Sequence, residues 1–113
     1  MDAEKALTVV LFIVCSAVLT IIAVPMMQGK VQPNWWYGVR TPKTLKNPQT
    51  WYAINTYAGK GLFVAGILSL FVSVGTALLP NWSAVDYVSI TGTVLLVIIS
   101  AVMIMTFVKL RSL

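Results

Sequence analysis

Histidine is absent from this chain of 113 residues, and acidic side chains and cysteine are scarce. The acids are Asp2, Glu4 and Asp86, and Cys15 is the single cysteine. The sequence therefore offers no paired carboxylates for acid–base chemistry, no Cys–His set and no cluster of metal ligands. We expect no enzymatic activity, no metal and no cofactor. A lone Cys15 in an apolar run acts as a small apolar residue and cannot form an intrachain disulfide.

Charge of either sign is also rare. Charged residues make up 10% of the chain and hydrophobic residues 58%, with a mean hydropathy of +0.87. A soluble domain of this length needs a more polar surface, so lipid must be the solvent for most of this one. No ionisable side chain lies in the middle of an apolar run, which excludes the usual parts of a proton relay or an ion pathway.

What the chain does contain is three long uncharged runs, at residues 6–27, 61–79 and 87–108, of 22, 19 and 22 residues. About 20 helical residues cross the roughly 30 Å of hydrocarbon in a bilayer. We predict an all-α integral membrane protein in which residues 1–113 form one domain of three transmembrane helices. The first run exceeds the roughly 7–15 apolar residues of a signal peptide and has an acidic flank, so we expect it to be retained.

The cations predict the orientation. One of them precedes the first span and the hairpin 80–86 has none, whereas seven lie in the first loop, at the start of the second span or at the C-terminus. Positive residues are retained on the cytoplasmic side, so the N-terminus should be outside and the first loop and C-terminus inside. The net charge of +5 then indicates contact with anionic lipid headgroups. Cations spread between spans do not favour nucleic-acid binding.

The segment between the first two spans is the richest in detail. Prolines and a glycine interrupt residues 28–47, which we predict to be a largely irregular but ordered cytoplasmic loop. Asn47 as a cap and Pro48 at the first helical position predict an interfacial helix over 48–60 that continues into the second span. The Trp and Tyr side chains of this segment suit the headgroup region, where we expect each of them to act as an anchor.

Small residues recur along the second span at intervals of four: Gly61, Ala65, Ser69, Ser73 and Ala77. Such a stripe lets helix backbones approach closely within lipid. We predict that it packs against the other two spans or against a second copy of the chain.

The loop also has the chemistry to bind an anion or an amphipathic peptide. Arg40 offers a planar fork for a carboxylate or phosphate, Lys43 and Lys46 add point charges, and the amides after Asn47 lie at a helix N-terminus. Two other roles for Arg40 stay open. It could contact lipid headgroups, or it could be a buried structural residue that ties the loop to helix-end carbonyls.

Residues 37–45 read Tyr-Gly-Val-Arg-Thr-Pro-Lys-Thr-Leu, and Asn47, Trp51, Asn55 and Gly59-Lys60 follow. This pattern resembles the signature of the SdpI family of small bacterial membrane proteins, approximately G-(I/V)-R-T-P-x-T-L, then a Trp, a polar residue and Gly-Lys. The residues that match it one by one are Gly38, Arg40, Thr41, Pro42, Thr44, Leu45, Trp51 and Asn55. With their neighbours Trp36, Tyr37, Lys43 and Asn47 they form the predicted ligand- or partner-binding set.

The best-known member of that family protects a bacterium from its own secreted toxin peptide and holds a soluble repressor at the membrane. The resemblance implies a multi-pass protein of the bacterial cytoplasmic membrane with an immunity role and a signalling role. This chain has fewer spans than that member. Two alternatives stay open: an accessory subunit that docks on a larger transporter or membrane enzyme, and a binder of lipid or of a small anion through Arg40 and Lys43.

Overall fold

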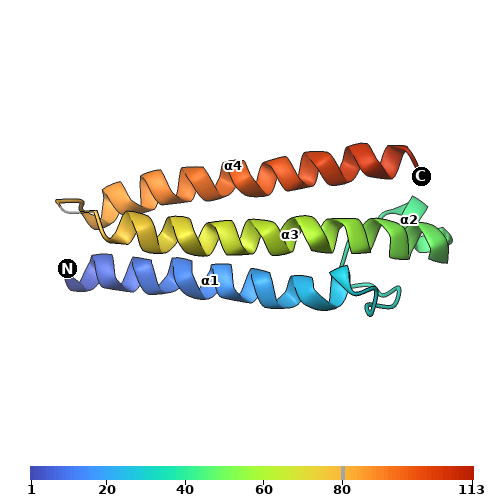
Figure 1. The fold of residues 1–113 in the computed structure, drawn as a ribbon, viewed down its shortest axis with the longest axis horizontal. Coiled ribbons are helices and arrows are strands. Elements are labelled where there is room, and N and C mark those ends of the chain that lie inside the picture. Colours follow the sequence, from blue (N-terminus) through green and yellow to red (C-terminus); the bar gives the residue numbers. More distant parts are fainter. Residues whose placement is uncertain (80) are drawn as a thin grey trace.

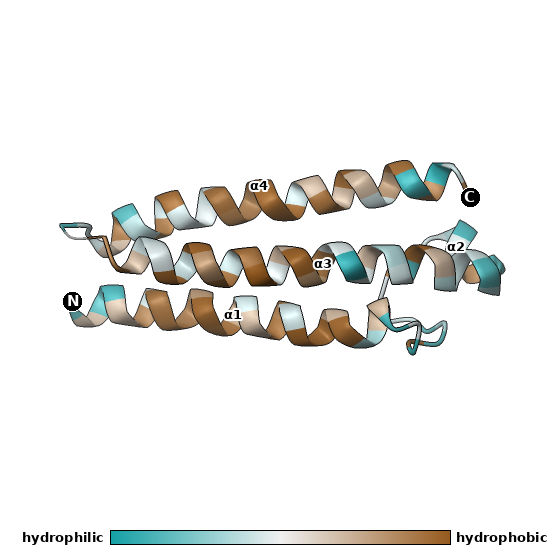
Figure 2. Ribbon diagram, in the orientation of Figure 1, coloured by the Kyte–Doolittle hydropathy of each residue, from teal (hydrophilic) through white to brown (hydrophobic). Residues whose placement is uncertain are grey.

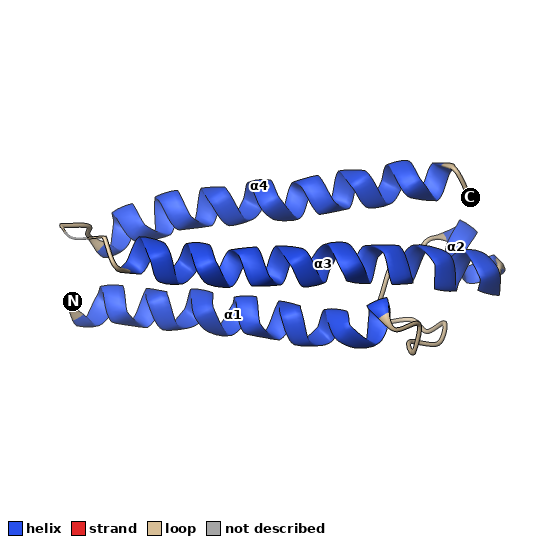
Figure 3. Cartoon of the chain, in the orientation of Figure 1, coloured by secondary structure: helices blue, strands red, loops and turns tan. Residues whose placement is uncertain are grey.

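A computed structural model describes residues 1–79 and 81–113. Its helices are α1 (Ala3–Met27), α2 (Pro42–Lys46), α3 (Pro48–Ala77) and α4 (Ala84–Arg111). Across the described residues there is no strand (Figure 3), which confirms the predicted all-α class. Part of the predicted hairpin 80–86 lies outside the described residues, because residue 80 is not among them.

The three long helices lie side by side, each antiparallel to the next in sequence, with α3 between α1 and α4 (Figure 1). The bundle measures 51 × 22 × 19 Å. The N-terminus and the α3–α4 connection lie at one end, and the first loop, α2 and the C-terminus lie at the other. Figure 2 shows hydrophobic residues filling the middle of the bundle and hydrophilic residues gathering at its ends. Helices α1, α3 and α4 are each long and apolar enough to cross a membrane.

Local capping explains where the long helices begin. The Asp2 side chain accepts a hydrogen bond from the Lys5 amide (2.7 Å), so α1 starts before the apolar run does. The Asn47 side chain caps α3, and its Oδ1 accepts from the Gln49 amide (2.9 Å). Helix α4 starts with a capping box in which Ser83 and Asp86 exchange hydrogen bonds.

The Lys5 side chain connects the beginning of α1 to the end of α3. Its side chain is buried, and its Nζ donates to the Leu79 carbonyl oxygen just beyond the end of α3 (3.4 Å). A cation at this position satisfies a carbonyl that the helix leaves unpaired and interacts favourably with the helix dipole. The end of α3 is thus tied to the beginning of α1.

The predicted stripe of small residues on α3 lies mostly inside the bundle. Three of its members are buried and two are half-buried: Ala65, Ser69 and Ser73, and Gly61 and Ala77 respectively. A Cβ atom on Gly61 would lie 3.0 Å from a Val102 methyl group of α4. The stripe therefore contributes to packing within one chain.

The closest approach between helices involves two glycines outside that stripe. A Cβ atom on Gly66 would lie 2.9 Å from the Thr20 Cα of α1, and one on Gly59 would lie 2.8 Å from the Met26 carbonyl carbon. These distances leave no room for a side chain. Gly59, Gly66 and the buried Ser73 are seven residues apart, and this spacing keeps them on one helix face. This seven-residue spacing of small residues is the sequence pattern that corresponds to the contact of Gly59 and Gly66 with α1.

We predict that Gly66→Ala lowers the melting temperature of the purified protein in detergent, because the added methyl group must push α1 away from α3. Overpacking of this kind costs about 1–3 kcal/mol. Gly75→Ala is the matched control, since a Cβ atom there would meet nothing within 4 Å. Alanine also favours a helix over glycine, so the control should melt at or above the wild-type temperature. Equal melting temperatures for the two variants would contradict this packing.

Candidate functional site

The motif loop, residues 28–47, is held to the bundle by a buried tryptophan. Trp51 is 0% exposed, and its indole Nε1 donates to the Val31 carbonyl oxygen (2.9 Å). It belongs to a cluster with Met26, Val31 and Ala58, against which half-buried loop side chains pack. The prediction that Trp51 is an interfacial anchor is therefore wrong. Its N–H finds a partner in the loop backbone, so the whole side chain can leave the surface.

Asn55 fixes the centre of the motif. Its Oδ1 accepts from the Val39 amide (2.6 Å), and its Nδ2 donates to the carbonyl oxygens of Val39 (3.4 Å) and Trp51 (2.9 Å). The side chain is 2% exposed. One residue thus satisfies both backbone groups of Val39 much as a neighbouring strand would.

Gly38 is required for this contact on two grounds. Its φ angle is +105°, a backbone conformation that residues with a side chain rarely adopt. A Cβ atom there would also lie 2.6 Å from Asn55 Oδ1, closer than real Cβ contacts come. The glycine of the motif therefore lets the loop backbone reach the amide of Asn55.

The Thr-Pro-Lys-Thr part of the motif forms the start of a short helix, α2. Thr41 Oγ1 accepts from the Thr44 amide (3.2 Å), while Thr44 Oγ1 accepts from the Thr41 amide (2.8 Å) and contacts the Val39 carbonyl oxygen (3.0 Å). Pro42 occupies the first helical turn. The loop is thus less irregular than predicted, because a capping box can order a helix too short to show any periodicity.

Lys43 and Asn47 connect the loop to the long helices. Lys43 Nζ donates to the Leu110 carbonyl oxygen in the last turn of α4 (2.8 Å), where a cation is favoured. Asn47 ends α2 and caps α3 at the same time. Leu45, half-buried, packs against the Trp51 cluster. The loop is therefore attached to both α3 and α4.

An Asn-centred turn shapes the outer part of the loop. Asn34 Oδ1 accepts from the amides of Trp36 (2.9 Å) and Tyr37 (2.6 Å). Trp35 and Trp36 are 81% and 80% exposed, and the Trp36 ring stacks on that of Tyr37. The Tyr37 hydroxyl donates to the Ile22 carbonyl oxygen of α1, and burial raises the pKa of this hydroxyl above its usual value.

Arg40 differs from the other motif residues. Its side chain is exposed, and it makes no hydrogen bond with the part of the chain that the structure describes. The alternative in which Arg40 is a buried structural residue is therefore excluded. Arg40 instead borders a groove of about 300 Å³, to which the loop contributes Gly38, Val39 and Thr41. The opposite wall is apolar except for Thr106, with these residues from α3 and α4: Ala58, Leu62, Val102, Met103, Thr106 and Phe107.

The structure thus separates the predicted set into two groups. Ten members build the loop or attach it to the helices: Tyr37, Gly38, Thr41, Pro42, Lys43, Thr44, Leu45, Asn47, Trp51 and Asn55. The side chains of Trp36 and Arg40 are exposed and therefore accessible to lipid or to a binding partner. Sequence reasoning missed Asn34, although an Asn directly after a proline is a turn signal. Within residues 1–79 and 81–113, no group of His, Cys, Asp or Glu side chains could hold a metal ion.

Fold and site together define a small three-helix membrane protein whose first interhelical loop is fastened to the second long helix and to the end of the third. The model of the SdpI/YfhL protein family matches residues 30–109, more than two thirds of the chain. The chain belongs to this family, and the resemblance seen in the motif is confirmed. The matched segment begins in the motif loop and extends into the last turns of α4. Neither the curated proteins nor the solved structures give a match.

We predict that Asn55→Leu loosens the motif loop, because it leaves the Val39 amide without its partner and the Val39 carbonyl oxygen with Thr44 alone. Leaving buried polar groups unpaired costs about 1–3 kcal/mol. In detergent, limited trypsin digestion should cut the variant after Arg40 faster than the wild-type protein. Gln49→Leu, the same change of an amide at an exposed position, is the control and should be cut at the wild-type rate. A wild-type cleavage rate for Asn55→Leu would show that Asn55 does not hold the loop.

Proposed function

We propose that this chain is an immunity protein that protects a bacterial cell from a membrane-active peptide, and that the motif loop contacts the peptide. Membership of the SdpI/YfhL family supports a membrane protein of this kind. The observation that carries the proposal is the position of Arg40, exposed at the mouth of an apolar groove while its neighbours in the motif hold the loop in place.

The chemistry of this position fits an amphipathic peptide. A guanidinium group offers a rigid fork of N–H donors that binds a carboxylate through two hydrogen bonds. The groove beside it presents apolar side chains of α3 and α4, including Leu62, Met103 and Phe107. A peptide with a carboxylate next to apolar side chains would satisfy both surfaces. The exposed Trp35 and Trp36 of the same loop add aromatic area at the interface.

Binding alone would suffice for protection, so the proposal includes no catalytic step and no cofactor. We place the protein in the bacterial cytoplasmic membrane with its N-terminus outside and the motif loop and C-terminus inside, on the basis of the seven cations at that end. In this orientation the loop would meet peptide that has entered the inner leaflet. It would also face soluble proteins of the cytoplasm, as a signalling role requires.

The two alternatives are less well supported by the geometry. Docking of an accessory subunit through the stripe of small residues would require the bundle to open, because Ala65, Ser69 and Ser73 are buried. Binding of a small anion jointly by Arg40 and Lys43 would have to use the remaining N–H groups of Lys43, because its amine already donates to the Leu110 carbonyl oxygen.

We predict that a sensitive bacterium expressing the wild-type chain survives culture supernatants containing secreted membrane-active peptides, and that Arg40→Gln abolishes this protection. The loss should occur at unchanged membrane level and melting temperature, since Arg40 is exposed and makes no hydrogen bond within the described chain. The control is Lys46→Gln, which removes an exposed cation of the same loop and should leave protection intact.

Two results would overturn the proposal. Absence of protection by the wild-type chain against every supernatant would remove the immunity role. Equal protection by the wild-type chain and Arg40→Gln would leave immunity in place but remove the motif loop as its site.

A further inference from the structure

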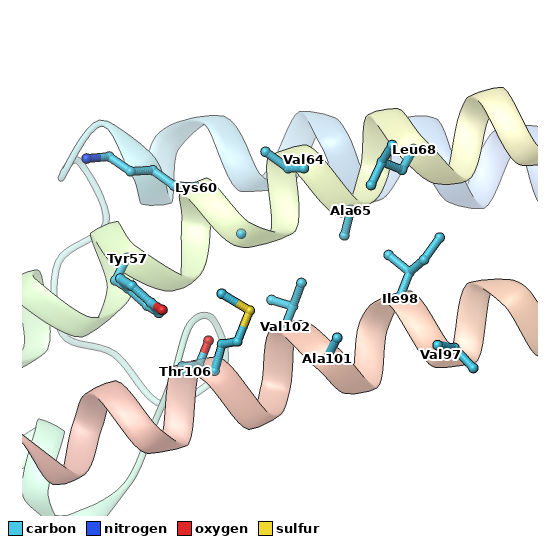
Figure 4. A pocket seen from close by; sticks show the side chains of 12 residues that line it. Tyr57, Lys60, Val64, Ala65, Leu68, Val97, Ile98, Ala101, Val102 and Thr106 are labelled. Carbon is cyan, nitrogen blue, oxygen red and sulfur yellow. The ribbon is translucent and has the colours of Figure 1, made fainter.

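A second, larger groove runs between α3 and α4 on the lipid-facing surface of the bundle. Its volume is about 550 Å³, within the roughly 300–1,000 Å³ of small-molecule sites. Figure 4 shows Val64 and Leu68 of α3 and Val97, Ile98 and Ala101 of α4 along most of its length. None of these five side chains carries a polar atom, so this part of the groove suits a hydrocarbon chain.

Polar groups meet the groove at one end only. Tyr57, Lys60 and Thr106 line the end nearest the motif loop, where Figure 4 shows Tyr57 facing Thr106 and the Lys60 amine extending away from α4. A second cation is close by, because Lys109 Nζ lies 5.9 Å from the centre of the Tyr57 ring. Lys60 and Lys109 are both exposed. An occupant that is apolar along the bundle and anionic at this end would match the groove.

The charge distribution of the whole chain favours a lipid over a second copy of the protein. Lys60 and Lys109 lie at the motif-loop end, whereas Asp2, Glu4 and Asp86 belong to the opposite end of the bundle. A second copy in the same membrane orientation would bring its own two lysines to the same depth and supply no side-chain carboxylate there. Like charges would then face each other across the contact.

We propose that the α3–α4 groove binds an anionic phospholipid of the leaflet that surrounds the motif-loop end. One acyl chain lies along the groove, and the phosphate lies at its Tyr57 end, beside Lys109, where the exposed Lys60 side chain can turn toward it. A bilayer places phosphates directly above its acyl chains, so one molecule satisfies both parts of the site. Basic pockets between transmembrane helices are known to bind anionic headgroups. This groove shares Val102 and Thr106 with the groove at Arg40, but the lipid proposal does not depend on the immunity role.

The test is native mass spectrometry of the full chain in detergent, with equal amounts of phosphatidylglycerol and phosphatidylcholine that carry identical acyl chains. The wild-type protein should retain phosphatidylglycerol in preference. The double variant Lys60→Gln/Lys109→Gln should lose this preference, by roughly fivefold for each lysine removed. Lys46→Gln is the matched control, since it removes an exposed cation of the same end that does not line the groove.

A second variant tests the apolar part of the site. Ala101 is exposed and lines the groove, so Ala101→Trp should fill it without displacing a buried side chain and should reduce retention of both lipids. Equal retention of the two lipids by the wild-type protein, or an equal loss in Lys46→Gln, would overturn the headgroup assignment. Unchanged retention in Ala101→Trp, or a lipid-free dimer of the wild-type chain, would overturn the groove as the site.

Discussion

The backbone of the motif loop must find hydrogen-bond partners at the edge of a bilayer, and the side-chain amide of Asn55 supplies two of them. Val39 is half-buried and Asn55 is 2% exposed, so water does not readily replace these bonds, and an unpaired N–H or C=O group there is costly. Because Asn55 lies on α3, the path of the loop is fixed relative to a membrane-spanning helix. Gly38 lets Val39 approach the Asn55 amide because it has no side chain. Thr44 Oγ1 donates a further hydrogen bond to the Val39 carbonyl oxygen.

The sequence predicted the class of the fold because lipid imposes a length of about 20 apolar residues on any helix that crosses it. The start of α3 could also be predicted from the sequence, since Asn47 and Pro48 cap this helix through contacts with neighbouring residues in the chain. Helix α2 was not, because five residues show no periodicity, although Thr41 and Thr44 are spaced as a capping box. The burial of Trp51 depends on the distant Val31 carbonyl, which composition cannot reveal.

For the candidate site, the motif marked a segment but did not show which of its residues hold the loop and which are exposed. Residue types such as Gly, Thr and Asn serve either a fold or a ligand, and only the contacts distinguish the two. Asn55 and Thr44 are buried and paired, whereas Arg40 is exposed beside a groove. The groove between α3 and α4 could not be predicted from the sequence, because Tyr57 and Lys109 are far apart along the chain and come together only through the antiparallel packing.

The contact of Lys43 with Leu110 also has a consequence for biosynthesis. The ribosome synthesises the motif loop before α4. Lys43 therefore cannot pair with the Leu110 carbonyl oxygen until the last turn of α4 has been made. At the other end of the bundle, Lys5 likewise cannot pair with the Leu79 carbonyl oxygen until α3 has been made. Each lysine therefore becomes paired only when a later helix has been made, and the motif loop cannot complete its contacts before α4 is in place.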